Sequence, residues 1–362
     1  MKRPFALIGI TYLSVQAALF YLESDLAAAI LTAVCFIGTI VSLFILKNRN
    51  LRHTVLCFCL TAAFASTIFS GYNIFVKQPI VDKYSEREIY VTATVFEQPT
   101  VQYDTYRYLI ETDSINGKIE KLKICLSTIN ELNVEEFDRI SCVLPLKECT
   151  KSQMIADGAF LQASVNKNFA YIVKNTDDKP LYYQALKIRE NFADSFEQNM
   201  SQDCASLCRA VLLGEKTALS QEIQNDFTRC GVSFLIVVSG MHLAIISSFV
   251  FLCIKKIIKN RVLRSMIMLI CAFSFMAVTG FAPSVVRAGV MLAVVYSGKM
   301  FMRKGDSLNS LGIAALILTV PNPTAVADVG MLLSFTATLG IILWARKITV
   351  YIMGKFEIGR AS

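Results

Sequence analysis

Residues 231–248, GVSFLIVVSGMHLAIISS, form an apolar run with three residues in its middle whose types could do chemistry: Ser239, Gly240 and His242. His53 is the only other histidine of the chain. A buried polar group without a partner costs free energy, so each of these residues needs a reason. They fit either a close contact between two helices, bridged by hydrogen bonds, or a hydrated path lined by polar groups.

We expect these groups to lie deep in a membrane-spanning helix over residues 232–254. Ser239 and His242 are three residues apart, so they would share one face of that helix. His242 would lie roughly 15 Å along the axis at about 1.5 Å per residue. A polar face at that depth is compatible with both roles.

Three further residues could contact a charged substrate in the membrane. Arg287 follows Pro283 by four residues, which places it about 6 Å along its helix from the outer surface. Its guanidinium could pair with Asp328, at the outer end of another span, or meet incoming phosphates, whose geometry its planar fork matches. Ser334 could line the same path or pack against neighbouring helices.

The elements that must position these residues are membrane-spanning helices. The chain of 362 residues is 54% hydrophobic and 18% charged, with a formal net charge of +8, which excludes a soluble enzyme and a disordered chain. About 20 apolar residues cross roughly 30 Å of hydrocarbon, and fewer suffice in short or broken helices. We expect about eight spans, at 5–22, 26–46, 54–76, 232–254, 263–281, 284–301, 308–320 and 326–345.

Basic residues beside these runs predict an orientation. All of them fall on one side of the membrane if the N-terminus is cytoplasmic. They are Lys2, Arg3, Lys47, Arg49, Arg52, Lys255, Lys256, Lys259, Arg261, Arg264, Lys299, Arg303, Lys304, Arg346 and Lys347. The pattern predicts a multi-pass protein of the cytoplasmic membrane, with residues 77–231 outside.

Residues 77–180 are expected to form a small external β domain. Alternation with period two covers residues 89–96, and further strands are expected at 106–112, 121–126, 139–146 and 159–173, with a tight turn at Asn116-Gly117. Five or six short strands fit an OB-like barrel. The insert has 13 Lys and Arg against 16 Asp and Glu, a net charge of −3, which argues against a strong hold on nucleic acid through overall charge.

Two groups of side chains in this insert leave alternatives open. The tyrosines could stack on nucleobases or fill the core and rim of the barrel, and they are Tyr90, Tyr103, Tyr106 and Tyr108. One disulfide could form among the external cysteines Cys125, Cys142 and Cys149, since bridges persist in an oxidising compartment. The chain has no CxxC pair and two histidines, so neither a metal site nor a cofactor is expected.

Residues 181–230 are typical of an amphipathic helical segment. An apolar stripe could lie on the membrane surface or against the barrel, and it comprises Leu181, Ala185, Ile188, Phe192 and Phe196. Ser220 indicates a helix start and Gly231 a helix end, while Asp306 and Asn309 are expected to cap the seventh span.

Three ordered blocks from Leu207 onward resemble the competence domain of ComEC-type DNA-internalisation proteins. The first joins Leu212-Leu213-Gly214 to GVSFLIVVSGMHLAI at 231–245. The second is TGFAPSVVRAGVM at 279–291, and the third is NPTAVADVGMLLSFTATLGI at 322–341. Phe234 stands where the family usually has His, and Leu332 where it often has Gln.

The resemblance implies a channel component that helps single-stranded DNA cross the cytoplasmic membrane during natural transformation. Its implied partners are single-stranded DNA, the lipid bilayer, a DNA receptor and a cytoplasmic translocation ATPase, and a homo-oligomer is one arrangement. No GxxxxGK[ST] loop occurs, so energy is expected from a partner or a gradient. The family's metallo-β-lactamase-like domain needs a cluster of His and Asp ligands, which two histidines cannot supply, so no enzyme is expected.

The expected organisation has four parts: three helices at 1–76, the external β domain at 77–180, the amphipathic segment at 181–230 and an incomplete competence domain at 231–362. Two other functions stay open. A small-solute transporter would use Arg287 and Asp328 as anion and ion sites, and it would predict inverted repeats, which the sequence does not show. A truncated remnant or a scaffold subunit is favoured by the early end of the chain and by Phe234 and Leu332.

Overall fold

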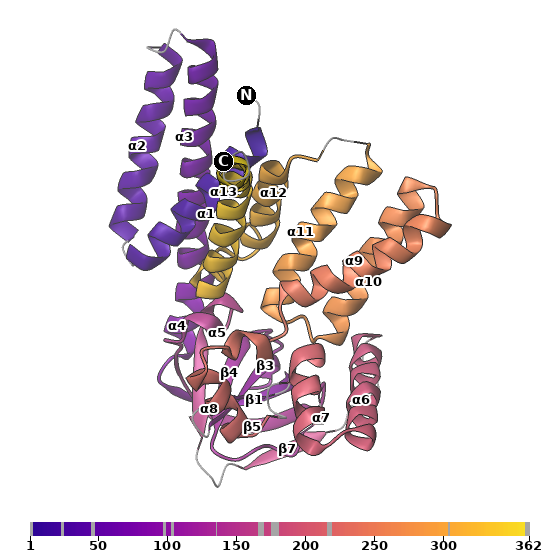
Figure 1. Ribbon diagram of the computed structural model, residues 1–362. Coiled ribbons are helices and arrows are strands. Elements are labelled where there is room, and N and C mark those ends of the chain that lie inside the picture. The colour runs from indigo at the N-terminus through magenta and orange to yellow at the C-terminus, as the bar shows by residue number, and fades with distance from the viewer. Residues whose placement is uncertain are drawn as a thin grey trace. The chain divides into compact units, whose positions relative to one another are not determined.

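The computed structural model describes residues 3–22, 25–44, 48–96, 99–102, 105–134, 136–165, 170–174, 181–215, 219–302 and 305–358. The chain divides into two compact units. The first comprises Met1–Tyr72, Asn260–Ser265 and Val290–Ser362, and the second Asn73–Lys259 and Met266–Gly289. The β domain, whose strands lie at the bottom of Figure 1, belongs to the second unit, while the helices after residue 259 are divided between the two units.

The first unit is helical. Its main elements are α1 (Pro4–Leu22), α2 (Asp25–Phe44), α3 (Arg49–Tyr72), α12 (Ser307–Thr319), the 3-10 turn η5 (Pro323–Ala327) and α13 (Val329–Ile358). Figure 1 shows α2 beside α3, and the hydroxyls of Thr32 and Ser66 lie 2.9 Å apart across that contact. Leu311 on α12 and Phe335 on α13 are buried together in the core of this unit.

Two glycines let α1 and α12 cross at backbone distance. A Cβ added at Gly9 would lie 2.1 Å from the carbonyl oxygen of Gly312, and one added at Gly312 would lie 2.1 Å from that of Phe5. Contacts between small residues of this kind are a common way for membrane helices to associate. The crossing holds the two predicted spans together without large side chains.

The predicted caps of α12 are present, with one difference. Asp306 Oδ1 accepts from the backbone N–H groups of Leu308 and Asn309, both at 3.1 Å, and so caps α12 as expected. Asn309 instead accepts through Oδ1 from the N–H of Ala6 at 3.0 Å. Its amide therefore satisfies the first turn of α1, because that turn has N–H groups without intrahelical partners.

The β domain in the second unit is a closed barrel. Its strands are β1 (Arg87–Val95), β2 (Thr100–Gln102), β3 (Thr105–Ile115), β4 (Lys123–Thr128), β5 (Arg139–Glu148), β6 (Leu161–Val165) and β7 (Tyr171–Lys174). The order β1-β3-β4-β6-β5 closes through β1–β5 pairing, and β4 and β6 run parallel. β2 extends β3 and β7 extends β5, so five strands make the barrel itself.

The alternating pattern in the sequence explains the barrel core. Ile89, Val91, Ala93 and Val95 point inward and are at most 3% exposed. Asn116 and Gly117 have φ of 48° and 81°, as a type I′ hairpin turn requires. Both predictions are confirmed. The strand expected over 159–173 is instead two strands, β6 and β7.

Helical elements lead into and out of the barrel. They are η1 (Asn73–Lys77), α4 (Gln78–Tyr84), α5 (Ser152–Ala156), α6 (Leu181–Asn199), α7 (Gln202–Cys208), η2 (Arg209–Leu213), α8 (Gln221–Arg229), η4 (Ser233–Ile236), α9 (Gly240–Ile257), α10 (Arg261–Val278) and α11 (Pro283–Met300). Ser220 caps α8 by accepting from the N–H of Ile223 at 3.3 Å. Gly231 follows that helix with φ of +72°, so the predicted start and end are confirmed.

The amphipathic helix α6 exposes part of the apolar stripe and buries another face. Ile188 and Phe192 are 48% and 52% exposed, so they do not pack against the barrel. Leu186, Arg189 and Ala193 are the buried residues of this helix, at most 6% exposed. Two residues of the apolar stripe are therefore exposed, and contact of the stripe with a membrane surface stays a prediction.

Five helices of the described chain are long and apolar enough to cross a membrane. They are Pro4–Leu22, Leu51–Tyr84, Gly240–Ile257, Arg261–Val278 and Val329–Tyr351. The apolar part of α2 and α12 are shorter than these. The protein is thus mostly helical with several candidate spans and a small barrel, while the count of about eight spans is not confirmed.

Candidate functional site

The polar residues Ser239 and His242 lie at a helix start and not in the middle of a span. α9 begins at Gly240, and Ser239 is its N-cap residue. The backbone N–H of Ser239 donates to Nδ1 of His242 at 3.1 Å, and Ser239 Oγ lies 3.2 Å from the same nitrogen. The two side chains form a capping box, in which each satisfies a backbone donor of the first turn.

This geometry corrects the expected placement of His242. The helix expected over 232–254 is interrupted, since residues 233–236 form a 3-10 turn and Ser239 has extended backbone angles. His242 therefore sits in the first turn of α9, and it does not share a helix face with Ser239. Serine is a strong N-cap residue, and His242 replaces the Glu or Gln of the usual capping box. Because Nδ1 accepts, the neutral ring carries its proton on Nε2.

Gly240 allows the starts of α9 and α11 to approach closely. A Cβ at Gly240 would lie 2.7 Å from the Cβ of Ala288. One turn earlier on α11, Ser284 Oγ donates to the carbonyl of Val238 at 2.7 Å. The close-contact role weighed for Gly240 is therefore present, and Arg287 lies next to Ala288 on the half-buried first turns of α11.

Asp328 and Ser334 have structural partners that the sequence did not suggest. Asp328 Oδ1 accepts from the N–H of Gly330 at 2.9 Å, at the N-terminus of α13. Ser334 is half-buried, and its carbonyl accepts from the hydroxyl of Thr338 at 2.8 Å. Arg287 belongs to the second unit and Asp328 to the first, so a pair between them stays a prediction.

Two glycine turns from the sequence blocks meet within the second unit. Gly214 has φ of +86°, and a Cβ there would lie 3.4 Å from the carbonyl oxygen of Thr279 and 3.8 Å from Cγ2 of Val238. Gly280, which follows Thr279, has φ of +67°. The left-handed region favours glycine at both positions. Parts of the first and second blocks are thus in contact around Val238, Gly214 and Thr279.

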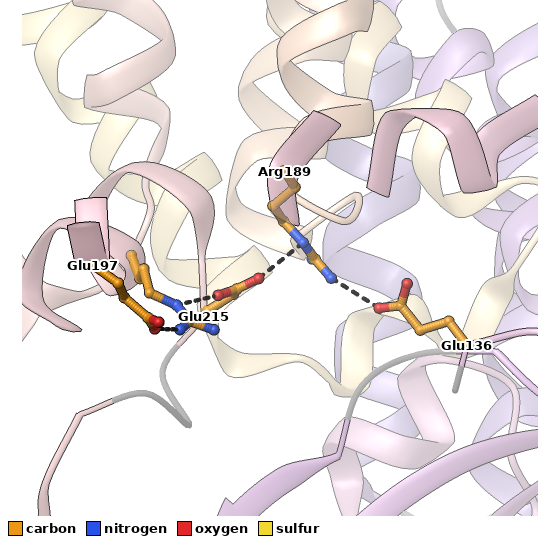
Figure 2. Close-up of polar contacts among 5 residues, drawn as sticks. Glu136, Arg189, Glu197 and Glu215 are labelled. Atoms are coloured by element: carbon orange, nitrogen blue, oxygen red, sulfur yellow. Dashed lines mark hydrogen bonds and ion pairs between the residues drawn. The ribbon is translucent and has the colours of Figure 1, made fainter. Parts of the chain in front are cut away.

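A group of ion pairs that sequence reasoning missed lies beside these turns. Arg189 on α6 contacts Glu136 through Nη2 at 2.8 Å and Glu215 through Nε at 3.1 Å (Figure 2). Arg209 contacts Glu215 at 2.8 Å and also pairs with Glu197. We call these five residues the Arg189 cluster. The available signal was Arg189 itself, three residues after Leu186 and four before Ala193, on the buried face of α6.

Burial governs the electrostatics of this cluster. The side chains of Arg189 and Glu215 are only 7% and 3% exposed, and that of Glu136 is 12% exposed. Removal from water raises the pKa of the Glu136 carboxyl, although Arg189 opposes that change. The cluster holds three carboxylates and two guanidinium groups, so it carries one excess negative charge when all are ionised.

The tyrosines of the barrel divide between core and surface. Tyr108 is 1% exposed, and its Oη accepts from the N–H of Leu132 at 2.8 Å. Tyr106 is half-buried and packs against the core, while Tyr90 is 47% exposed. Tyr103 lies outside the described residues. The barrel-core interpretation therefore holds for Tyr108, and among the described tyrosines of this group Tyr90 is the exposed one.

Cys125, Cys142 and Cys149 of the β domain are buried free thiols. Cys125 is on β4 and Cys142 on β5, which are separated by β6 in the barrel. Burial raises the pKa of the Cys142 thiol to about 12. The structure thus gives no support to the expected disulfide among Cys125, Cys142 and Cys149. Within the described ranges, no three His, Cys, Asp or Glu side chains gather as metal ligands would.

Part of the chain is similar to a known protein family. Residues 211–359 match the family described as Competence protein. ComE operon protein 3 of Bacillus subtilis (strain 168) is 20% identical over 325 residues, which are 88% of this chain and 41% of that protein. The chain thus spans about two fifths of the length of the curated relative it matches. No solved structure matches.

The matched range contains the features described above. It includes Gly214, the start of α9 at Ser239 and His242, the turn at Thr279-Gly280 and the capped start of α13 at Asp328. The relative covers the barrel as well, since its alignment extends over most of the chain. The resemblance found in the sequence is confirmed: residues 211–359 match the Competence protein family, and most of the chain aligns with ComE operon protein 3.

Proposed function

We propose that this chain takes part in moving single-stranded DNA across the cytoplasmic membrane during natural transformation. The observation that carries the proposal is the competence domain over residues 211–359. Apolar helices of membrane-spanning length support a place in the bilayer. The one-sided basic loops favour a multi-pass protein with a cytoplasmic N-terminus and an external barrel.

The corrected position of His242 changes where DNA would meet the helices. In the proposed orientation, the N-terminal ends of α9 and α11 are their outer ends. His242 and Gly240 then belong to the mouth of a path, together with Arg287 next to Ala288. Arg287 is the residue we assign to incoming phosphates, because a guanidinium binds phosphate through two parallel hydrogen bonds.

The other path candidates have supporting roles in this proposal. Ser239 and Asp328 start α9 and α13 by capping them, and we propose that Ser334 packs against neighbouring helices. Single-stranded DNA and the bilayer are the partners the proposal needs directly. A DNA receptor, a cytoplasmic translocation ATPase and a second copy of the chain are further proposed partners, since no nucleotide-binding loop in the sequence supplies energy.

The test is uptake of labelled DNA by cells that carry the full-length gene in place of the native copy. Deleting the gene should abolish the entry of DNase-resistant label while leaving surface binding. Arg287→Ala should reduce entry severely and Arg287→Lys partly, because lysine keeps the charge and loses the fork. Arg229→Ala is the matched control, since Arg229 is 82% exposed and lies on α8.

The outcomes distinguish a role of the chain in DNA uptake from a role of Arg287 in binding the DNA. Normal entry of label in the deletion strain would show that the chain has no role in DNA uptake. Loss of entry in the deletion strain with normal entry in Arg287→Ala would keep the function and remove Arg287 from the path. Membrane abundance of each variant, measured by immunoblot, must match the wild type for either conclusion.

A further inference from the structure

One helix contacts both the barrel and the turn between two spans. Arg189 reaches Glu136, and the ring of Tyr182 lies 5.9 Å from that of Phe137, so α6 holds two consecutive residues ahead of β5. On the other side, a Cβ at Gly280 would lie 3.1 Å from Nη1 of Arg189 and 3.7 Å from Oη of Tyr182. All of these residues belong to the second unit.

The same two side chains serve both contacts. Tyr182 and Arg189 are seven residues apart, so they lie on one face of α6, two turns apart. The ring of Tyr182 also lies 5.2 Å from that of Phe281, the neighbour of Gly280. Tyr182 and Arg189 therefore contact two separate segments. One is residues 136–137 of the barrel, and the other is residues 280–281 between α10 and α11.

The ion pair between Arg189 and Glu215 is buried, so removal of either charge would cost free energy of folding. Arg189 is 7% exposed and Glu215 is 3% exposed, so each has lost most of its contact with water. A buried charge is tolerated when it is paired, and removal of one partner leaves the other uncompensated. Glu215 directly follows Gly214, whose turn packs on Thr279. Arg189 thus also contacts the residue that follows the Leu212-Leu213-Gly214 part of the first sequence block.

We propose that Tyr182 and Arg189 are positioning residues that latch the barrel to the turns at 213–215 and 279–281. The latch fixes the position of the barrel relative to the C-terminal end of α10 and the N-terminal end of α11. It acts through Gly280 and Phe281 on the residues that lead into α11, and so on the first turns that carry Arg287. The latch itself does not depend on what the protein transports, and only its effect on uptake rests on the proposed function.

Backbone hydrogen bonds provide three reporters of the latch. The N–H of Phe137 donates to Val95 at 2.8 Å, that of Phe281 to Met276 at 2.8 Å and that of Glu215 to Arg209 at 3.2 Å. Amides bonded in this way exchange with solvent when the local structure opens. Hydrogen exchange of the full chain in lipid nanodiscs, read on peptides that contain these amides, measures whether the turns open together.

Tyr182→Leu is the first variant, because it removes both ring contacts without leaving a buried charge. We expect exchange at Phe137 and at Phe281 to become roughly tenfold faster together, while Ile140 and Leu144 in β5 keep wild-type exchange. Faster exchange at only one of the two turns, or at neither, would overturn the latch. The matched control is Tyr90→Leu, an exposed tyrosine on β1, which should leave both turns unchanged.

Arg189→Gln is the second variant, and it should speed exchange at all three reporter amides. Arg189→Lys should restore part of the protection, since a lysine can pair with one carboxylate but cannot bridge Glu136 and Glu215. Arg139→Gln is the control, because it breaks an exposed pair with Asp113 at 3.3 Å on the same barrel. If Arg189→Gln unfolds the whole unit, the exchange measured in Tyr182→Leu alone decides whether the latch exists.

Uptake of DNA gives a separate readout. Loosened turns with lost uptake would support the latch and its place in the proposed function. Loosened turns with normal uptake would keep the latch as a structural device and remove its role in transport. Wild-type exchange in Tyr182→Leu would overturn the latch whatever the uptake result.

Discussion

The barrel and the helices distribute apolar side chains in opposite ways. Ile110, Ile124 and Leu144 of the barrel are fully buried, as in a water-soluble domain. On the helices, large apolar residues face outward, with Phe249 on α9 67% exposed and Leu333 on α13 64% exposed. The same kind of residue is sequestered in one region and displayed in the other, because one is built for water and the other for lipid.

The barrel and the helices also differ in how their polar groups are hydrogen-bonded. In the barrel, a buried polar atom such as Oη of Tyr108 bonds to a neighbouring loop. In the helical regions, several polar residues cap helix starts, as Ser239, Asp306 and Asp328 do. A helix start within lipid or near its surface must satisfy its N–H groups inside the protein. Polar residues in apolar runs can therefore mark helix ends as well as transport paths.

The largest expected effect comes from the barrel core. Leu144→Ala should lower the free energy of unfolding of the barrel by about 2–5 kcal/mol, since it removes a fully buried side chain and leaves a cavity. Phe249→Ala, on the outward face of α9, should change stability by less than about 1 kcal/mol. Denaturant titration of the full chain in detergent, read by hydrogen exchange of β1 and β5, measures both. Equal losses of stability in the two variants would contradict the view that the barrel buries its apolar side chains while the helices expose theirs to lipid.

The next effect tests how the helices associate. Gly312→Ala would place a Cβ 2.1 Å from the carbonyl oxygen of Phe5, so α1 and α12 must separate. We expect a loss of about 1–3 kcal/mol, or a fall in folded yield. Gly340→Ala on α13 is the control, because no atom lies within 4 Å of the added Cβ. Thermal unfolding in detergent should separate the variants, and equal melting temperatures would exclude a backbone contact at this crossing.

Much of the fold follows from the sequence, for identifiable reasons. The alternation of Ile89, Val91, Ala93 and Val95 predicted β1, because a one-sided strand has a strict period of two, and Asn116-Gly117 predicted the turn that leads from β3 to β4. The interruption of the span before Ser239 could not be read from hydropathy, since residues 232–239 are as apolar as the helix that follows. Only the capping pair Ser239 and His242, three residues apart, carried that information.

A smaller effect is expected at the start of α9. His242→Leu removes the acceptor for the N–H of Ser239 and should cost about 1 kcal/mol. His242→Gln should keep the cap, because a glutamine at this position accepts the same bond. Hydrogen exchange in the first turn of α9 should rise in the leucine variant and stay low in the glutamine variant. Equal protection in both would show that the capping box does not stabilise this start.

The candidate site was harder to predict than the fold. Arg189 lies on α6 and Glu136 ahead of β5, 53 residues apart in the chain, and no sequence pattern links the two residues. The predicted stripe through Ile188 and Phe192 is the exposed one. A helical wheel gives the faces of a helix, but the choice of buried face depends on partners that come from distant parts of the chain.

The smallest effect is a pH dependence that comes from Glu136. Burial raises the pKa of this carboxyl in the folded protein above its ordinary value of 4.5, so the folded state holds the proton more tightly than the unfolded chain does. The stabilisation from this group is therefore complete below the unfolded pKa and is lost as the pH rises through the folded pKa. Arg189 and Glu190 on α6 and Glu215 after Gly214 are the charged groups that face it.

The net charge of the Arg189 cluster explains why stability should fall as the pH rises. With Glu136 protonated, Glu197 and Glu215 balance Arg189 and Arg209, whereas ionisation of Glu136 adds an excess negative charge among buried groups. Denaturant titrations between pH 4.5 and 7 should show a small fall in stability with rising pH. Glu136→Gln should flatten it, and Glu131→Gln, at an exposed position of the same loop, should not. A stability that rises with pH through this window in the wild type, with a rise that disappears in Glu136→Gln, would show that pairing with Arg189 outweighs the burial of that carboxylate.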